Sequence, residues 1–217
     1  FLSSSLIFLV SYFALWLSFS LHQSEVSDYL INNIDSNQLS KFYIPLTIHD
    51  HLVLVEIVRA SIQRAWSQFQ KVENVALLLI ALGQQSTVSK LYNVIGDTPR
   101  GDFFTHDFTT KKYRKSAIKN AYSSLCHGGY EMSAALFIIS GEIETGMKVI
   151  TEKIGDPVLG FLVLRLLTGS DYESKIMKWY LSVARWNDDV IPILISKLTN
   201  NNNMFELLEK ALLENET

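Results

Sequence analysis

The feature that most constrains this chain is a series of helix-forming segments, each about 10 to 17 residues long, that glycine and proline separate. Gly83, Gly141 and Gly155 each follow a segment with a helical pattern, at the position where glycine commonly ends a helix. Asp156-Pro157 then offers an N-cap residue and a proline in the first turn of the next helix. No segment alternates in the manner of a strand. The pattern therefore predicts an all-α fold, an α-solenoid of stacked antiparallel helix pairs.

Apolar residues recur at steps of three and four along most of the chain, which marks one face of a helix. Residues 96–108 form the longest segment that is expected to be irregular, and residues 35–41 form a polar break. The expected helices cover residues 7–34 (as one long or two short helices), 52–70, 74–82, 86–95, 109–125, 130–140, 143–154, 156–167, 172–185, 188–198 and 204–213.

Three regions follow from this reading. Residues 1–41 form an N-terminal apolar helical segment, residues 42–199 form the solenoid domain, and residues 200–217 form an Asn-rich linker with a terminal helix. The chain begins at Phe1 rather than at Met, so we expect a fragment, a processed chain or an incomplete gene model. In that case part of the function lies outside these residues.

The first 21 residues carry no charge and are long enough to span a bilayer. They lack the basic flanks that set membrane topology, and also the basic region and cleavage site of a signal peptide. Three interpretations stay open for them: a buried helix of the solenoid, a membrane segment or a signal peptide. A buried helix that is apolar on all sides would need a second packing surface.

Composition excludes several classes of function. The chain has 217 residues, 48% of them hydrophobic, which is enough to bury a core and argues against disorder. Its net charge is −3, so it lacks the basic field that nucleic-acid binding requires. The single cysteine, Cys126, excludes an internal disulfide and a thiolate zinc site. We expect it to be a reduced cytosolic thiol that packs as a small hydrophobic residue.

No motif in the chain points to catalysis. His49-x-His51 resembles half of a metal site, but no further ligand has suitable spacing. Arg100-Gly101-Asp102 matches a cell-attachment tripeptide, which short sequences contain by chance. There is no Ser-His-Asp order, no glycine-rich phosphate loop and no coherent carboxylate pair. The sequence therefore predicts no enzyme activity, no metal, no cofactor and no small-molecule substrate.

A basic cluster stands out in the first turns of the helix expected from residue 109. Lys111, Lys112, Arg114 and Lys115 lie there, and Lys119 follows one turn later. Basic residues at a helix N-terminus oppose the macrodipole, so local helix energetics do not favour them. An acidic surface of a partner or an anionic membrane would explain their presence. The alternative is a solvated basic face without a partner.

Residues 103–137 carry an ordered pattern of aromatic, small and polar residues that resembles a known family. The pattern matches the large subunit of the RAVE complex, whose animal members are the DmX-like or rabconnectin proteins. The resemblance covers roughly residues 55–167, with a weaker part at 10–34. The residues that carry it most clearly are Phe103, Phe104, Asp107, Phe108, Tyr113, Arg114, Lys119, Asn120, Ala121, Tyr130, Glu131, Ala134 and Ala135.

The chain departs from the family pattern at a few positions. Tyr113 stands where the family usually has Trp, and Ile138 replaces the second residue of a Phe pair. Gly128-Gly129 replaces a turn rich in Lys and Arg, and we expect the two glycines to loosen that turn. Any partner contact that the family makes through this turn is therefore in doubt here.

The resemblance implies a binding and bracing role without catalysis. Members of the family are large scaffolds, with WD-repeat propellers followed by a helical region, that promote assembly of the vacuolar proton pump (V-ATPase). The implied partners are peripheral-sector subunits of that pump and other RAVE-type subunits. The implied location is cytoplasmic and peripheral to endomembranes, at the vacuole, endosome or vesicle. Two alternatives stay open: an α-solenoid subunit of a vesicle coat or tethering complex, and an integral membrane protein anchored by residues 1–21.

The motif residues are expected to act mainly in holding the fold. The rings of Phe103, Phe104 and Phe108 would anchor the loop before the helix. Lys119 and Asn120 would make polar contacts between helices or with the loop. Ala134 and Ala135 are small enough to let a crossing helix approach closely. The face that carries Lys111, Lys112 and Lys115 is the candidate partner surface.

Overall fold

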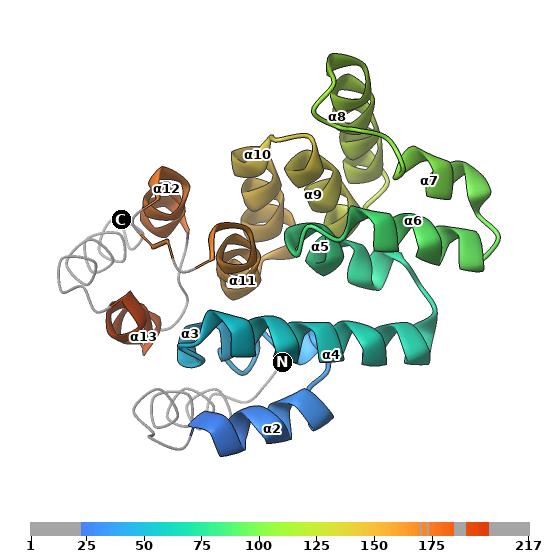
Figure 1. Ribbon diagram of the computed structural model, residues 1–217. Helices are drawn as coiled ribbons and strands as arrows, with labels where there is room; N and C mark the ends of the chain where they lie inside the picture. Colours follow the sequence, from blue (N-terminus) through green and yellow to red (C-terminus); the bar gives the residue numbers. More distant parts are fainter. Residues whose placement is uncertain (1–22, 170, 173, 185–189, 200–217) are drawn as a thin grey trace. The chain divides into compact units, whose positions relative to one another are not determined.

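The chain folds into helices alone throughout the part that the structure describes (Figure 1). The computed structural model describes residues 23–169, 171–172, 174–184 and 190–199. These residues form α-helices, a short 3-10 helix and a π-helical segment, and no β-strand occurs among them. The predicted all-α class is confirmed.

The elements follow one another with short connections. They are α2 (Gln23–Asn33), η1 (Ser36–Gln38, 3-10), α3 (Ile44–Thr47), α4 (His51–Phe69), α5 (Glu73–Ala81), α6 (Gln85–Val94), α7 (Thr98–Phe103), α8 (Lys111–Cys126), α9 (Tyr130–Ile139), α10 (Ile143–Lys148), η2 (Val149–Ile154, π), α11 (Pro157–Thr168), α12 (Lys175–Val183) and α13 (Val190–Thr199).

The structure corrects the sequence prediction in four segments, one of which is α3, where the sequence pattern predicts no helix. Residues 96–108 are not irregular throughout, because α7 forms where the Asp97 side chain accepts the Arg100 backbone N–H at 3.1 Å. A helix of this length is too short to show a periodic apolar pattern. The polar break at 35–41 contains η1, and the helix expected at 143–154 changes from α to π winding at Val149.

Two further predictions concern residues outside the described part of the chain. The first part of the expected 7–34 helix and the terminal helix at 204–213 both lie there, as does the apolar segment 1–21. Among the described helices, none combines the length and the apolar character that crossing a membrane requires.

The described helices gather into two compact units. Unit 1 takes its residues from 1–61 and 157–217, and unit 2 comprises residues 62–156. The chain passes from one unit to the other within α4 and again between η2 and α11. The domain boundaries predicted after residues 41 and 199 stay a prediction.

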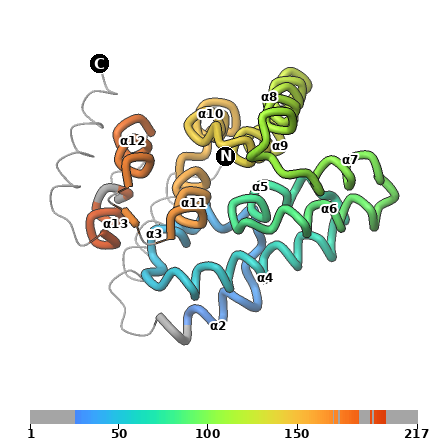
Figure 2. The backbone as a smooth tube through the Cα atoms, turned by 45° about the horizontal axis from the view of Figure 1, so that its top comes forward, coloured from blue at the N-terminus to red at the C-terminus, as the bar shows by residue number. Residues whose placement is uncertain are grey.

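Helix α9 is the centre of unit 2. It packs against α8, α5, α10 and η2, and the views in Figures 1 and 2 both show α8 and α10 beside it. Its residues 133–138 are all buried, as are residues 75–81 of α5. An apolar helix that is buried all round needs neighbouring helices on every side to cover it. Unit 2 is therefore built around the contact between α5 and α9.

Short turns make successive helices of unit 2 into packed pairs. The pairs α5–α6, α8–α9 and α9–α10 are each joined by three residues and are each in contact. Gly83, Gly141 and Gly155 end their helices with φ values of 70°, 84° and 76°, as the sequence predicts. Consecutive hairpins of this kind are compatible with the predicted α-solenoid.

Unit 1 depends on a buried arginine that caps a short helix. The Arg165 side chain of α11 is fully buried, and its Nη1 donates to the carbonyl oxygens of Pro45 and Ile48 at 2.6 and 2.8 Å. Its Nη2 donates to the His49 carbonyl oxygen at 3.3 Å. These oxygens lie at the C-terminal end of α3, where helix carbonyls lack partners and the macrodipole is negative. Arg165 therefore serves as a C-terminal cap supplied by another helix.

The environment of this guanidinium is unusual for a buried cation. No carboxylate of the described residues pairs with Arg165, and the Tyr172 ring lies 5.7 Å from its Cζ atom. Burial lowers the pKa of Arg165, and the nearby Tyr172 and Asp50 act in the opposite direction. Carbonyl dipoles and an aromatic face thus replace the usual anionic partner.

The start of α4 completes this corner of unit 1. The Asp50 Oδ1 accepts the backbone N–H groups of Leu52 and Val53 at 2.7 and 3.3 Å, so Asp50 caps α4. Removal from water, together with the charge of Arg165, lowers the pKa of His51 below its ordinary 6.5, and Asp50 opposes this shift. A neighbouring arginine cation also disfavours a metal ion at His49-x-His51. The described residues hold no group of three or more His, Cys, Asp or Glu side chains that could bind a metal.

We expect Arg165→Met to lower the free energy of unfolding by roughly 3–5 kcal/mol, because it leaves buried carbonyl oxygens without donors. Urea unfolding followed by circular dichroism measures this loss. Arg165→Lys, which keeps a donor and the charge, should fall between Arg165→Met and the wild type. Lys175→Met, at an exposed position of the same unit, serves as the control and should stay within about 0.5 kcal/mol. A loss for Arg165→Met as small as this control's would contradict the capping role.

The lowered pKa of His51 predicts a stability that falls with acidification. The unfolded chain binds a proton at His51 near pH 6.5, whereas the folded chain binds it only at lower pH. Stability from this group is thus fully present above pH 6.5 and declines as the pH falls through that value. Urea unfolding at pH 7.5 and 5.5 should show a smaller decrease for His51→Gln than for the wild type. Equal decreases in the two proteins would contradict the assignment.

Candidate functional site

The aromatic residues of the family-like motif form a cluster between α7 and α8. Phe104 and Phe108 are buried and Phe103 is half-buried. The Phe103 ring lies 5.3 Å from that of Phe104 and 5.1 Å from that of Phe108. Tyr92 of α6 stacks on Phe104 at 5.8 Å. The three phenylalanines thus lie together at the end of α7, where they attach the following loop to α6.

Polar side chains of α6 hold both α7 and the loop that follows it. The Gln85 Nε2 donates to the carbonyl oxygens of Phe104 and His106, both at 2.7 Å. The Ser89 hydroxyl donates to the Gly101 carbonyl oxygen at 2.8 Å. Sequence reasoning missed both side chains, because an isolated Gln or Ser on a helix gives no signal for a contact with a distant loop.

Arg100 joins α7 to α5. Its Nη1 lies 3.2 Å from the Glu73 Oε1, and its Nε lies 3.3 Å from the Asp97 Oδ2. The Tyr92 hydroxyl donates to the same Glu73 oxygen at 3.4 Å, and burial raises the pKa of Tyr92 to about 12. Because Arg100 is paired and Gly101 is buried within a helix, the Arg-Gly-Asp tripeptide is not displayed as an exposed loop.

Tyr113 and Arg114, near the start of α8, also make contacts within unit 2. The Tyr113 ring lies 4.0 Å from the His106 ring. The Arg114 Nη2 lies 2.7 Å from the Glu142 Oε1, which links α8 to the residue before α10. Asp107 is exposed, and hydrogen bonds from the Thr109 hydroxyl and backbone N–H lower its pKa. These motif residues order the chain from the loop into the helix.

Small residues contribute to the contact between α8 and α9. Ala121 of α8 and Ala134 and Ala135 of α9 are fully buried. The Ser133 hydroxyl donates to the Ala121 carbonyl oxygen at 2.9 Å. On the other side of α9, a Cβ atom at Gly146 would lie 3.1 Å from the Ala134 carbonyl oxygen. Small side chains therefore let both neighbouring helices approach the α9 backbone closely.

The Gly128-Gly129 turn between α8 and α9 is fixed by hydrogen bonds. Gly128 has a φ of 78°, a conformation that side chains disfavour. The Ser124 hydroxyl donates to the Gly129 carbonyl oxygen at 2.8 Å, and a Cβ at Gly129 would lie 2.6 Å from that hydroxyl oxygen. The positive φ explains a glycine at position 128, whereas the expectation that the pair loosens the turn stays a prediction.

The opposite face of α8 is basic and exposed. Lys111, Lys112, Lys115 and Lys119 all lie on the surface. The Lys112 Nζ lies 5.0 Å from the centre of the Tyr113 ring. Neither the Lys119 nor the Asn120 side chain makes a hydrogen bond with a described residue, so the polar contacts expected of these two side chains are absent there. Cys126, the last residue of α8, is exposed, so the expectation that it packs as a small hydrophobic residue is wrong.

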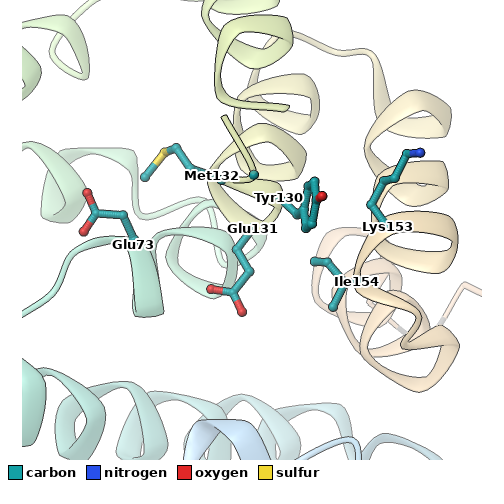
Figure 3. Close-up of a pocket in the computed structure, with 8 residues that line it drawn as sticks. Glu73, Tyr130, Glu131, Met132, Lys153 and Ile154 are labelled. Carbon is teal, nitrogen blue, oxygen red and sulfur yellow. The ribbon is translucent and has the colours of Figure 1, made fainter. Parts of the chain in front are cut away.

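A pocket of about 380 Å³ lies where the α8–α9 turn meets η2. Figure 3 shows Glu131 between Glu73 on one side and Lys153 and Ile154 on the other. The Glu73 carboxylate is already bonded to Arg100 and Tyr92. Removal from water raises the pKa of Glu131, which has no hydrogen bond or ion pair with a described residue. The lining thus offers one uncommitted carboxyl and no nucleophile beside a base.

The motif residues therefore divide by role. The buried rings and alanines hold the fold, Tyr130 and Glu131 line the pocket, and the lysines face solvent. The sequence pattern that unites them matches a known family over most of the chain. The model of the family described as RAVE protein 1 C terminal matches residues 17–187. The chain belongs to this family.

Relatives with the DmX-like name support this RAVE-type assignment. DmX-like protein 1 of Mus musculus is 31% identical over 114 residues, and DmX-like protein 1 of Homo sapiens is 31% identical over 113 residues. Each alignment covers 50% of this chain and 4% of the length of the relative. The chain is thus similar to a small part of those proteins.

We expect Gln85→Ala to free the loop of this RAVE-type domain. The variant removes two hydrogen bonds to part-buried carbonyl oxygens, which should lower the free energy of unfolding by about 1–3 kcal/mol. Backbone amides of residues 103–108 should also exchange with deuterium faster. Gln63→Ala, at an exposed position of the same unit, is the control and should change neither quantity. Unchanged exchange in Gln85→Ala would show that the aromatic rings alone hold the loop.

Proposed function

We propose that this chain is a non-catalytic scaffold or binding domain of a regulator of V-ATPase assembly. In this role it promotes association of the peripheral ATPase sector with the membrane sector. The observation that carries the proposal is the family match over residues 17–187, which contains the whole motif. The proposed partners are peripheral-sector subunits of the pump and other RAVE-type subunits. The proposed location is cytoplasmic and peripheral to endomembranes.

The geometry of unit 2 supports binding rather than catalysis. Most motif residues pack inward, where they brace short helices against one another. The pocket lining contains no nucleophile paired with a base, and its two glutamates lie in different environments. What unit 2 offers outward is an exposed basic helix on a rigid hairpin, a suitable surface for a protein partner.

The helical hairpins of unit 2 also favour a second candidate. Stacked helix pairs of this kind are common to α-solenoids of many functions, so a subunit of a vesicle coat or tethering complex would share the architecture. The two candidates differ in the proteins that they bind.

Affinity purification of the tagged, full-length native protein from cell lysate tests the proposal. We expect mass spectrometry to recover peripheral-sector subunits of the pump above the level of an untagged control. Depletion of the protein should also move those subunits from the membrane fraction to the soluble fraction. Recovery of coat or tethering subunits would support the second candidate instead. Recovery of no pump subunit, with the sectors unaffected by depletion, would contradict the proposal.

A further inference from the structure

Helix α8 concentrates positive charge in a chain that is acidic overall. Its 16 residues include Lys111, Lys112, Arg114, Lys115 and Lys119 and no acidic residue, whereas the net charge of the chain is −3. Only Arg114 among them has a carboxylate partner in the described part of the chain. Lys111, Lys115 and Lys119 have no carboxylate partner there, and all three side chains are exposed to solvent.

The position of these lysines is unfavourable for the helix itself. The first turn of α8 contains no acidic residue, and the side chain of the N-cap residue Thr110 accepts no hydrogen bond from it. Lys111, the first residue of α8, therefore lies at the positive end of the macrodipole without an acidic residue in the same turn. Packing does not account for them either, because the buried residues of α8, Ala117 and Ala121, lie on its other side.

Helical spacing places the free lysines in one row. Lys111, Lys115 and Lys119 are each four residues apart, so they project from the same side of α8 at successive turns. Tyr122 follows three residues after Lys119 on the same side of the helix. From Lys111 to Tyr122 the row is about 16 Å long, at the helical rise of about 1.5 Å per residue. The Tyr122 side chain is 53% exposed, yet its ring is held edge-on to that of Phe137 at 5.0 Å. The row thus ends in a rigid aromatic residue.

We infer that the row formed by Lys111, Lys115, Lys119 and Tyr122 is a docking surface for an acidic helix of a protein partner. A partner helix with carboxylates at every fourth residue matches the spacing and the charge of the three lysines. Tyr122 supplies the pre-ordered aromatic contact that commonly dominates binding energy at protein interfaces. The inference deepens the proposed function and rests on it for the source of this helix, a subunit of the pump.

The composition of the face favours a protein over a membrane. Helices that insert into a membrane surface present Trp, Phe or Leu on the inserting side. On the described surface of α8, Tyr122 is the one large apolar side chain that is well exposed. A row with regular helical spacing and one aromatic residue packed against Phe137 fits a shaped partner better than a fluid headgroup layer.

Charge reversal along the row tests the inference. The face variant is Lys111→Glu/Lys115→Glu/Lys119→Glu in the full-length native protein. Its matched control is Lys71→Glu/Lys90→Glu/Lys148→Glu, which makes the same change in net charge at exposed lysines elsewhere in unit 2. Glutamate near a helix N-terminus is favoured by the macrodipole, so the face variant should keep its helix content. Circular dichroism checks this before binding is measured.

We expect the face variant to recover pump subunits at least about tenfold less than the wild type, while the control recovers them normally. Recovery by the wild type should also fall steeply between 50 and 300 mM salt, because screening weakens exposed charge pairs. A benzophenone amino acid in place of Tyr122 should cross-link, on illumination, to a peptide rich in Asp and Glu.

The outcomes separate the inference from the proposed function. Pump recovery by the face variant equal to that of the control overturns the inference and leaves the function standing. If the wild type recovers no pump subunit, the proposed function fails. Cross-linking at position 122 then decides the inference, and a neutral or basic peptide, or no cross-link, overturns it. Loss of binding only to vesicles of phosphatidylcholine and phosphatidylserine would identify a membrane surface and also overturn it.

Discussion

The close approach of helices around α9 is the constraint on which unit 2 depends. Ser133, Ala134 and Ala135 are small and fully buried, and a Cβ atom added at Gly146 of α10 would lie only 3.1 Å from the Ala134 carbonyl oxygen. The Ser133 hydroxyl then reaches the α8 backbone directly. Larger residues would separate α8 from α9, and the turn at Gly128-Gly129 could no longer close. The orientation of the outer face of α8 follows from this packing.

Unit 1 depends on a different constraint, because α3 is too short to stabilise its own C-terminal end. The four residues of α3 have no room for internal hydrogen bonds to satisfy their last carbonyl groups. Arg165, more than a hundred positions later in the chain, supplies the missing donors. A buried cation thus serves as part of the backbone hydrogen-bonding system, with carbonyl dipoles in place of a carboxylate.

The sequence was sufficient for the local structure and insufficient for the long-range contacts. Apolar spacing and the glycines at 83, 141 and 155 located most helices, because both signals act within a few residues. Arg165 and Gln85 could not be predicted, since their partners are brought near only by the fold. Lys119 and Asn120 failed as interhelical contacts because motif membership does not reveal which side of a helix a residue occupies.

The two faces of α8 divide stability from recognition. Substitutions at Ala117 or Ala121 would act on the amount of folded protein in a cell, since they disturb the packed interior. Substitutions at Lys115 would change that amount little, because its side chain is exposed and has no ion pair with a described residue. A screen that scores variants by protein abundance would therefore detect the effects of substitutions on the inner face of this helix alone. Substitutions on the outer face would have little effect in such a screen, even where they abolish the binding of a partner.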